Sequence, residues 1–149
     1  MEEKKIISDD SSKIFWGKNI KIGSYVEIRC LENSTIKFGD NVKLDDNVRI
    51  IAVKNSILKI RNNCKIGKGS VINLGHKKIL IGENTSTYMN VLIYSSEHQM
   101  GDSNFRKSYI HKNIVIGKNC LIGASAIIKP GSIVRDNTFI NHNQVYEDS

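Results

Sequence analysis

The sequence predicts an all-β fold in which short strands wind into the stacked coils of a three-sided prism. Three observations predict it. The 149 residues include 24 Ile and 9 Val against only 7 Leu and 3 Ala, so strand formers outnumber strong helix formers and a helical bundle is excluded. An aliphatic residue recurs at every sixth position over long stretches. Gly, Asn and Asp fall between these aliphatics, where the corners of a coil would lie.

The clearest run of this repeat begins at Ile116 and reads IGKNCL, IGASAI, IKPGSI, VRDNTF and INHNQV. A helix repeats its apolar positions every three or four residues and a flat strand every two, whereas a period of six fits short strands separated by corners. Each six-residue unit, or hexad, is expected to point one large aliphatic inward and a smaller residue four places later. This second set comprises Val26, Val42, Val48, Cys64, Ser70, Thr85, Val91, Cys120 and Ala126.

The chain is expected to form one solenoid domain over residues 19–149, with hexads that also begin near Ile22, Phe38, Ile60 and Ile81. Three hexads make one coil of about 18 residues, which gives around six coils. Two segments carry no hexad. Residues 1–18 are expected to form an N-terminal arm or a cap, and an irregular loop occupies about 94–113. A long insertion in a regular solenoid is usually functional.

Composition limits the partners that the chain can take. The formal charge of +7 favours an anionic partner, but Lys and Arg are scattered singly and aromatic residues make up only 7%, which disfavours nucleic acid. No signal peptide is evident and no apolar run is long enough for membrane insertion. Three widely spaced cysteines match neither a disulfide framework nor a CxxC metal pair, so a cytoplasmic location is expected.

The hexads, the IGKNCLIGASAIIKPGS stretch and the histidine of SSEH at the start of the irregular loop resemble the hexapeptide-repeat acyltransferases. The resemblance covers roughly residue 19 to the C-terminus and points to the branch with galactoside, maltose and capsular-polysaccharide O-acetyltransferases. It implies a left-handed parallel β-helix, a homotrimer, acetyl-CoA as the donor, and active sites in the clefts between neighbouring subunits.

The resemblance assigns the general base to His98, which matches the family's catalytic histidine in NVLIYSSEH. An imidazole titrates near neutrality, and a general base contributes about 10²–10⁴-fold to rate. The alternative is an exposed loop histidine without a role. His76, His111 and His142 are each more typical of structural histidines.

The resemblance also suggests residues that bind the acceptor sugar. Asn73, in the coil before the one that bears His98, loosely matches a substrate-contacting asparagine, and Asn90 lies eight residues before His98. Arg106 in the loop is a candidate for an anionic group of the acceptor, or else a solvated loop arginine.

For acetyl-CoA, the resemblance directs the backbone N–H of Ala124 toward the thioester oxygen and places Gly123 beside the pantetheine arm. His142 falls at a position that lines the CoA channel. Glu147 and Asp148 replace a Thr-Lys pair that usually helps to bind the cofactor, so the phosphates must find positive charge elsewhere. The outward-facing candidates are Lys118, Lys129 and Arg135.

These features predict an acetyl-CoA-dependent O-acetyltransferase that acts on a sugar hydroxyl of a saccharide or cell-surface polysaccharide precursor. An N-acetyltransferase of a nucleotide-linked amino sugar is the alternative within the fold, because an amine needs the same geometry. A non-catalytic scaffold or binding protein is the alternative from another class. A zinc lyase on the same prism needs converging imidazoles, usually with an HxxxxH pair, which the four histidines do not form. No metal is expected.

Overall fold

The structure, a computed structural model, describes residues 3–99, 101, 103 and 108–147. Three parallel sheets surround one core, and the described residues contain no helix. Sheet A holds β1 (Lys5–Ser8), β4 (Glu27–Cys30), β7 (Arg49–Val53), β10 (Val71–Gly75), β13 (Leu92–Tyr94), β18 (Ile127–Ile128) and β21 (Val145–Tyr146). Sheet B holds β2 (Lys13–Phe15), β5 (Thr35–Phe38), β8 (Ile57–Ile60), β11 (Lys78–Ile81), β16 (Ile114–Ile116) and β19 (Ile133–Val134). Sheet C holds β3 (Lys21–Ile22), β6 (Lys43–Leu44), β9 (Lys65–Ile66), β12 (Ser86–Thr87), β17 (Leu121–Ile122) and β20 (Phe139–Ile140).

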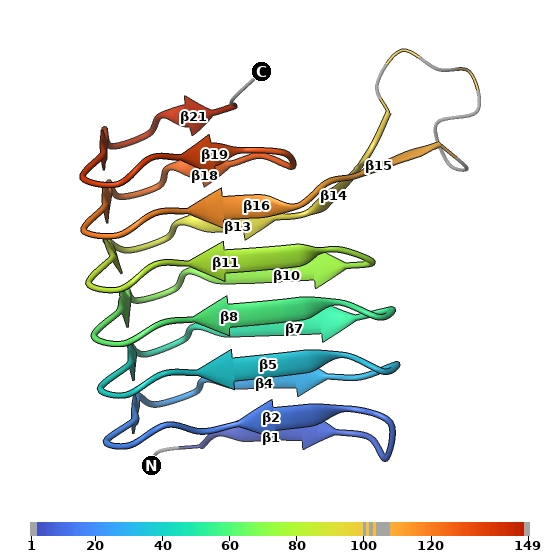
Figure 1. Ribbon diagram of the computed structural model, residues 1–149, viewed down its shortest axis with the longest axis vertical. Coiled ribbons are helices and arrows are strands. Elements are labelled where there is room, and N and C mark those ends of the chain that lie inside the picture. The colour runs from blue at the N-terminus through green and yellow to red at the C-terminus, as the bar shows by residue number, and fades with distance from the viewer. Residues whose placement is uncertain (1–2, 100, 102, 104–107, 148–149) are drawn as a thin grey trace.

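The chain visits sheets A, B and C in turn, so it climbs through six complete turns, and β21 begins a seventh (Figure 1). This arrangement is an all-β parallel solenoid and confirms the predicted fold class. The expected 18 residues per turn hold only for the C-terminal part, where Lys118 bonds to Asp136 eighteen residues later. In the first turns equivalent residues are 22 apart, as for Asn33 and Asn55. The extra residues lengthen the strands of sheets A and B and the corner between them, and they interrupt the six-residue repeat.

The hexad positions form the core, as predicted. Ile116, Ile122, Ile128, Val134 and Ile140 are all buried, and so is every member of the smaller second set. The large and small inward residues of successive turns stack into one continuous apolar column. No turn could bury its own apolar residues alone, so the turns stabilise one another.

The N-terminal segment belongs to the solenoid rather than to a separate arm. Strand β1 pairs with β4 and β2 pairs with β5, both in parallel. Trp16 stacks on Phe38 with 4.9 Å between ring centroids. Residues from Lys5 onward therefore form the first turn, which closes the lower end of the column in Figure 1.

Glycine and asparagine both lie at the corners, but for different structural reasons that the sequence pattern alone did not distinguish. Asparagines take the left-handed backbone conformation, for example Asn119 at φ 56° and Asn137 at φ 62°. Gly117 is needed for another reason: a Cβ there would lie 2.7 Å from the backbone nitrogen of Asp136 in the next turn. The hexad glycines thus permit close stacking of turns.

The predicted loop leaves the solenoid between sheets A and B of the fifth turn. Its base is a two-stranded antiparallel hairpin of β14 (Ser96–His98) and β15 (Tyr109–His111). The hairpin extends away from the column at the corner between β13 and β16 (Figure 1). It is the described part of the chain that departs from the parallel winding.

Candidate active site

A cavity of about 310 Å³ lies where the hairpin leaves the solenoid, at the corner between sheets A and B. Turns three and four supply one wall and the hairpin supplies the other. The lining residues are Val53, Lys54, Asn73, Gly75, His76, Ser96, Tyr109 and His111. No carboxylate is among these eight, so their side chains offer only neutral and basic groups to a ligand.

Side chains alternate across the hairpin, and the alternation gathers its polar residues on one face. Ser96 is opposite His111, and His98 is opposite Tyr109, so these four residues share a face. Glu97 lies between them in sequence and on the other face. Since Ser96, Tyr109 and His111 line the cavity, His98 continues the cavity face toward the tip of the hairpin.

Ser96 and His111 form the shortest polar contact of the cavity. Ser96 Oγ lies 2.6 Å from His111 Nδ1 and 3.2 Å from the carbonyl oxygen of Gly75. The buried Ser95 supports this corner from inside: its hydroxyl accepts a bond from the Gly75 N–H at 3.1 Å and donates to the Gly75 carbonyl at 3.3 Å. The serine and the histidine are therefore held against the backbone of turn four.

The surroundings of His111 favour its neutral form. Partial burial lowers the pKa of His111 below its ordinary value of 6.5, and the charges of His76, Lys77 and Lys54 lower it further. The His76 and His111 ring centroids are 4.5 Å apart. An imidazole in this setting is unprotonated at neutral pH and can accept a proton.

His98, the predicted base, lies near this cavity but not in its lining. Its ring contacts Tyr109 at 4.4 Å between centroids, and Tyr109 stacks at 5.7 Å on His111. His98, Tyr109, His111 and His76 thus form a continuous run of rings from the hairpin to the solenoid corner. His98 is the exposed end of that run.

Asn73 is the one predicted acceptor-binding residue that the structure brings to the cavity. Asn90 lies at the other end of sheet A, at the corner with sheet C, where it adopts φ 58°. Arg106 lies outside the described residues, as does Asp148.

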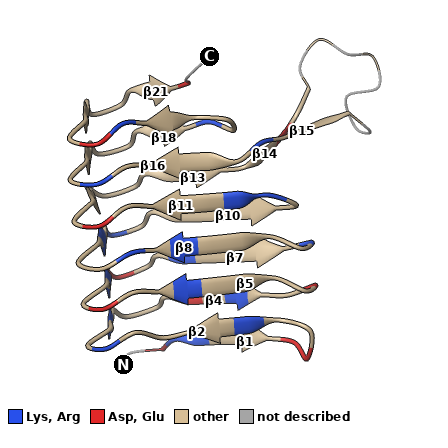
Figure 2. Cartoon of the chain, viewed as in Figure 1, with Lys and Arg blue, Asp and Glu red and all other residues tan. Residues whose placement is uncertain are grey.

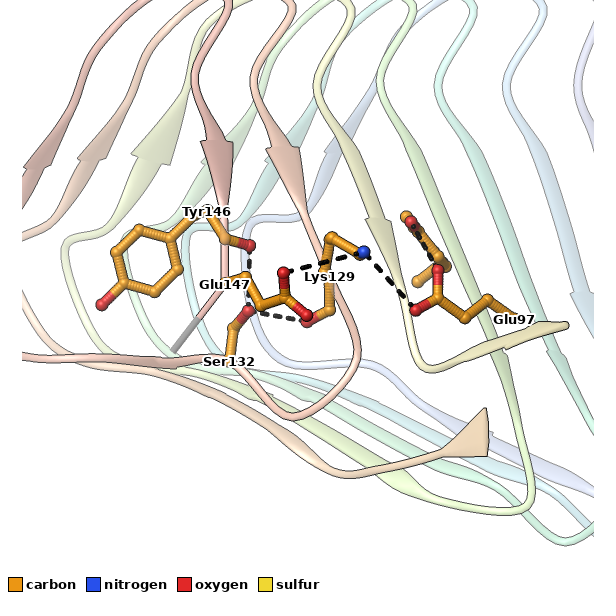
Figure 3. A network of polar contacts seen from close by, with 6 residues as sticks. Glu97, Lys129, Ser132, Tyr146 and Glu147 are labelled. Atoms are coloured by element: carbon orange, nitrogen blue, oxygen red, sulfur yellow. Dashed lines mark hydrogen bonds and ion pairs between the residues drawn. The ribbon is translucent and has the colours of Figure 1, made fainter. Parts of the chain in front are cut away.

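Lys129, predicted to bind CoA phosphates, is held in an ion-pair network beside the hairpin. Its Nζ lies 3.6 Å from Glu97 and 3.8 Å from Glu147 (Figure 3). The Tyr94 hydroxyl donates to Glu97 at 3.2 Å, which links the network to strand β13. The lysine charge is therefore compensated by two carboxylates within this chain.

Gly123, Ala124 and His142, three more residues predicted for the donor site, meet at the corner between sheets C and A. The N–H of Ala124 donates to Nδ1 of His142 at 2.7 Å. At the corner between sheets B and C of the same two turns, the N–H of Lys118 donates to Asp136 at 2.8 Å, so His142 takes the place that an aspartate has there. A Cβ on Gly123 would lie 2.5 Å from the backbone nitrogen of His142, which requires glycine for turn stacking.

Sequence reasoning did not select the residues that make the cavity polar. Ser96 was not among the predicted site residues, and His76 and His111 were predicted to be structural. The available signal was the spacing of Ser96 and His111 at the two ends of one loop, because a hairpin at the loop base pairs its first and last residues. His76 also carried a signal in the sequence, because a histidine stands where turns two and three have Asn33 and Asn55. All three adopt the left-handed backbone conformation, His76 at φ 66°.

Comparison with known proteins supports the fold. No family model and no curated protein matches the sequence. Among solved structures, the chain is similar to AntD, an N-acyltransferase from Bacillus cereus. A serine-to-cysteine variant of AntD in complex with dTDP-4-amino-4,6-dideoxyglucose and coenzyme A aligns with 89% of this chain and 70% of its own, at TM-score 0.71 and 19% identity.

AntD in complex with dTDP and 3-hydroxybutyryl-CoA aligns with 96% of this chain and 73% of its own, at TM-score 0.65 and 15% identity. OatWY, a polysialic acid O-acetyltransferase, aligns along 100% of this chain and 92% of its own at 15% identity, with a TM-score of only 0.43. At these identities the likeness to AntD establishes a shared fold, which confirms the predicted resemblance at the level of fold.

Two absences among the described residues bear on metals and membranes. No three His, Cys, Asp or Glu side chains among them are grouped so that they could hold a metal ion. No helix in the described part of the chain is long and apolar enough to cross a membrane.

Proposed function

We propose that the chain is an acyl-CoA-dependent acyltransferase that acts on a sugar. The observation that carries the proposal is the polar cavity at the base of the hairpin, which collects a serine, an asparagine and two histidines on an acyltransferase fold. The reaction joins an acceptor oxygen or nitrogen to a thioester carbonyl and releases the CoA thiol. It requires a proton acceptor near the acceptor group, and a neutral imidazole can fill this role.

A sugar hydroxyl is the proposed acceptor group, with acetyl-CoA as the donor and a saccharide or polysaccharide precursor as the acceptor. The cavity lining supports a hydroxyl because the Lys54 ammonium would repel a protonated amine. An amino sugar linked to a nucleotide is the second candidate. The likeness to AntD, an N-acyltransferase crystallised with a dTDP-linked amino sugar, favours it.

The complete site is proposed to lie between subunits of a homotrimer. Within one chain, Gly123, Ala124 and His142 lie at the C–A corner, whereas the cavity lies at the A–B corner, so sheet A separates the two groups. Chains packed side by side can bring one subunit's cavity to another's C–A corner. The Ala124 N–H would then reach a thioester only if the His142 side chain gave up its bond.

CoA phosphates need cations in this proposed cleft. Lys129 must exchange its two carboxylate partners for phosphate, whereas Lys118 and Arg135 are exposed on the last turns. Replacing Glu147 by Gln removes one competitor of phosphate for Lys129. We therefore expect Glu147→Gln to strengthen CoA binding and Lys129→Glu to weaken it in calorimetric titrations, both effects fading as salt rises.

A thiol-release assay tests the proposed function. Purified protein is given acetyl-CoA or 3-hydroxybutyryl-CoA with a panel of neutral sugars, amino sugars and nucleotide-linked sugars. We expect CoA release that depends on the acceptor. Mass spectrometry before and after mild alkali distinguishes an ester from an amide, because only the ester is cleaved. The absence of acceptor-dependent release, together with the absence of CoA binding at millimolar ligand, would favour a scaffold.

The same assay tests the predicted base. If His98 is the general base, His98→Ala lowers kcat by about 10²–10⁴-fold and leaves CoA affinity and melting temperature nearly unchanged, since the hairpin and not the core holds it.

A further inference from the structure

The hydroxyl of Ser96 has two polar neighbours but only one proton to give. One neighbour is the Gly75 carbonyl oxygen at 3.2 Å, which can only accept a hydrogen bond. The other is Nδ1 of His111 at 2.6 Å, which can donate or accept. Both contacts are hydrogen bonds only if Ser96 donates to Gly75 and accepts from an Nδ1–H of His111. This arrangement leaves the Nε2 of a neutral His111 with a free lone pair.

The charges around His111 keep that lone pair available. Burial and the positive groups from two neighbouring solenoid corners, Lys54 from turn three and His76 with Lys77 from turn four, lower the pKa of His111. From the hairpin itself, the facing titratable group is Tyr109, whose ring stacks on His111. Proton uptake from a bound hydroxyl is therefore possible at neutral pH without prior loss of a proton to solvent.

The cavity is also the right size and chemistry for a small acceptor. Its volume of about 310 Å³ is at the lower end of ligand pockets, which suits one sugar unit rather than a long chain. The side chains of Asn73 and Lys54 supply a donor, an acceptor and a cation for sugar hydroxyls or an acidic substituent. His98, by contrast, lies beyond Tyr109 on the exposed part of the hairpin.

From these contacts we infer that His111 is the proton acceptor for acyl transfer to a sugar hydroxyl bound in this cavity, and that Ser96 positions it. This inference rests on the proposed function and reassigns the base from His98. The hydroxyl oxygen attacks the thioester carbonyl while its proton passes to Nε2 of His111. A C–O bond forms, the C–S bond breaks, and the proton returns from His111 to the departing CoA sulfur.

The arrangement of protons can be measured without any reaction. In the full chain labelled with ¹⁵N-histidine, long-range ¹H–¹⁵N spectra identify which ring nitrogen of each histidine carries the proton. We expect neutral His111 to be protonated at Nδ1 and to titrate below pH 6.5. Ser96→Ala should lower the titration midpoint further, because the imidazolium loses its acceptor. A His111 protonated at Nε2 when neutral would overturn the inference.

Kinetics test the role itself. We expect His111→Ala to lower kcat by about 10²–10⁴-fold, with partial rescue by added imidazole, and His98→Ala to lower it less than about tenfold. Ser96→Ala should move the acid limb of kcat/KM to lower pH and reduce kcat with KM little changed, and Ser96→Thr should restore both. Melting temperatures of all four variants exclude a folding defect as the cause.

The outcomes separate the two proposals. A wild-type protein that transfers no acyl group to any acceptor overturns the proposed function and, with it, the role of His111. A wild-type protein that is active and tolerates His111→Ala, but not His98→Ala, overturns only the role of His111 and restores the base predicted from the sequence.

Discussion

The corner between sheets A and B is wide in the lower turns of the solenoid and narrow in the sixth. In turn three the wide corner carries Lys54 and Asn55, both with left-handed backbone angles, φ 56° and φ 61°. In turn six the corner is Lys129-Pro130-Gly131-Ser132, where Ser132 N–H donates to the Lys129 carbonyl at 3.2 Å and Gly131 has φ 86°. A Pro-Gly pair with this bond is typical of a type II turn.

The change in width explains where a site can form. Strand β10 of turn four has 5 residues, whereas β18 of turn six has 2, so the lower turns project farther at this corner (Figure 1). The hairpin leaves between them, its base contacts the projecting corner of turn four, and turn three completes the lining of the cavity. In a solenoid whose turns were all narrow, no corner would project beside the hairpin. The cavity therefore depends on the difference in corner width between the lower and upper turns.

The outer faces of the lower and upper turns also differ, in the charge that they carry. On sheet C, Lys21, Lys43 and Lys65 occupy successive turns in register, and the same column ends in Leu121 and Phe139. On sheet B, Lys37 and Lys59 lie in register, and the same column continues through Leu80 to Val115 and Ile133. Figure 2 shows the basic residues on strands of the lower turns, while β16 and β18 are largely uncharged. The charged faces suit solvent, and the apolar ones suit contact with another chain.

The largest expected effect is therefore the loss of subunit association when charge is placed on the apolar outer faces of the upper turns. Ile133 is 52% exposed and Phe139 is 55% exposed, so lysine at both sites should leave the fold intact. If these faces associate in the proposed trimer, the double substitution Ile133→Lys and Phe139→Lys should convert it to monomers of 16.8 kDa and abolish acyl transfer. Light scattering with the thiol-release assay measures both.

Lys37→Ala with Lys59→Ala, in the basic part of sheet B, is the matched control and should leave the assembly unchanged. A wild-type chain that is monomeric at micromolar concentration would contradict the intersubunit site, whichever residues line it.

The fold could be predicted from the sequence because its core repeats. The six-residue period depends only on local geometry, and the same inward positions recur on every turn. The pattern that identifies a buried residue therefore appears many times along the chain. The first turn was missed because Lys5–Ser8 is exposed throughout and carries no hexad. The 22-residue turns appeared only as interruptions, since extra corner residues such as Lys54 and Asn55 have no apolar signature.

The candidate site was less predictable because it depends on one event that does not repeat. Ser96 meets His111 only through the register of a single hairpin, and His76 meets them only because turn four projects beneath it. Loop position and family resemblance led to His98, two hairpin pairs farther out. The bond between Ala124 and His142 was readable in principle, since their separation of 18 residues equals that of Lys118 and Asp136.

A moderate effect is expected where glycine lets one turn stack closely on the next. A Cβ at Gly123 would lie 2.5 Å from a backbone nitrogen and 2.7 Å from a backbone carbon of the next turn, so Gly123→Ala must push the turns apart. Overpacking of this kind costs about 1–3 kcal/mol. The melting temperature should fall by several degrees, measured by circular dichroism.

Gly75 at the wide corner provides the matched substitution. The nearest atom to a Cβ there is 3.8 Å away, and its φ is not in the left-handed region, so Gly75→Ala should change stability by less than about 0.5 kcal/mol. Equal destabilisation by the two alanines would mean that the wide corner is as closely packed as the C–A corner that holds Gly123.

The smallest effect concerns how acid pH changes the stability contributed by the wide corner in the first turn. Asp9 accepts bonds from the Glu32 backbone N–H at 2.8 Å and the Ser11 hydroxyl at 2.9 Å. The Glu32 bond, then the hydroxyls of Ser12 and Ser11, lowers the pKa of Asp9 from 3.8 to about 2. Because the folded-state pKa is the lower one, this carboxylate stabilises the fold above about pH 4 and loses its contribution as pH falls toward 2.

Asp9→Asn should therefore reduce the free energy of unfolding at pH 7, and its difference from wild type should shrink between pH 4 and pH 2. At the narrow corner, the Ser132 hydroxyl donates to the Lys129 carbonyl at 2.7 Å, a bond between neutral groups. Ser132→Ala should cost about 1 kcal/mol at every pH in this window. Urea unfolding at pH 7, 4, 3 and 2 measures both variants. A pH-independent difference for Asp9→Asn would show that the wide corner, like the narrow one, does not depend on charge.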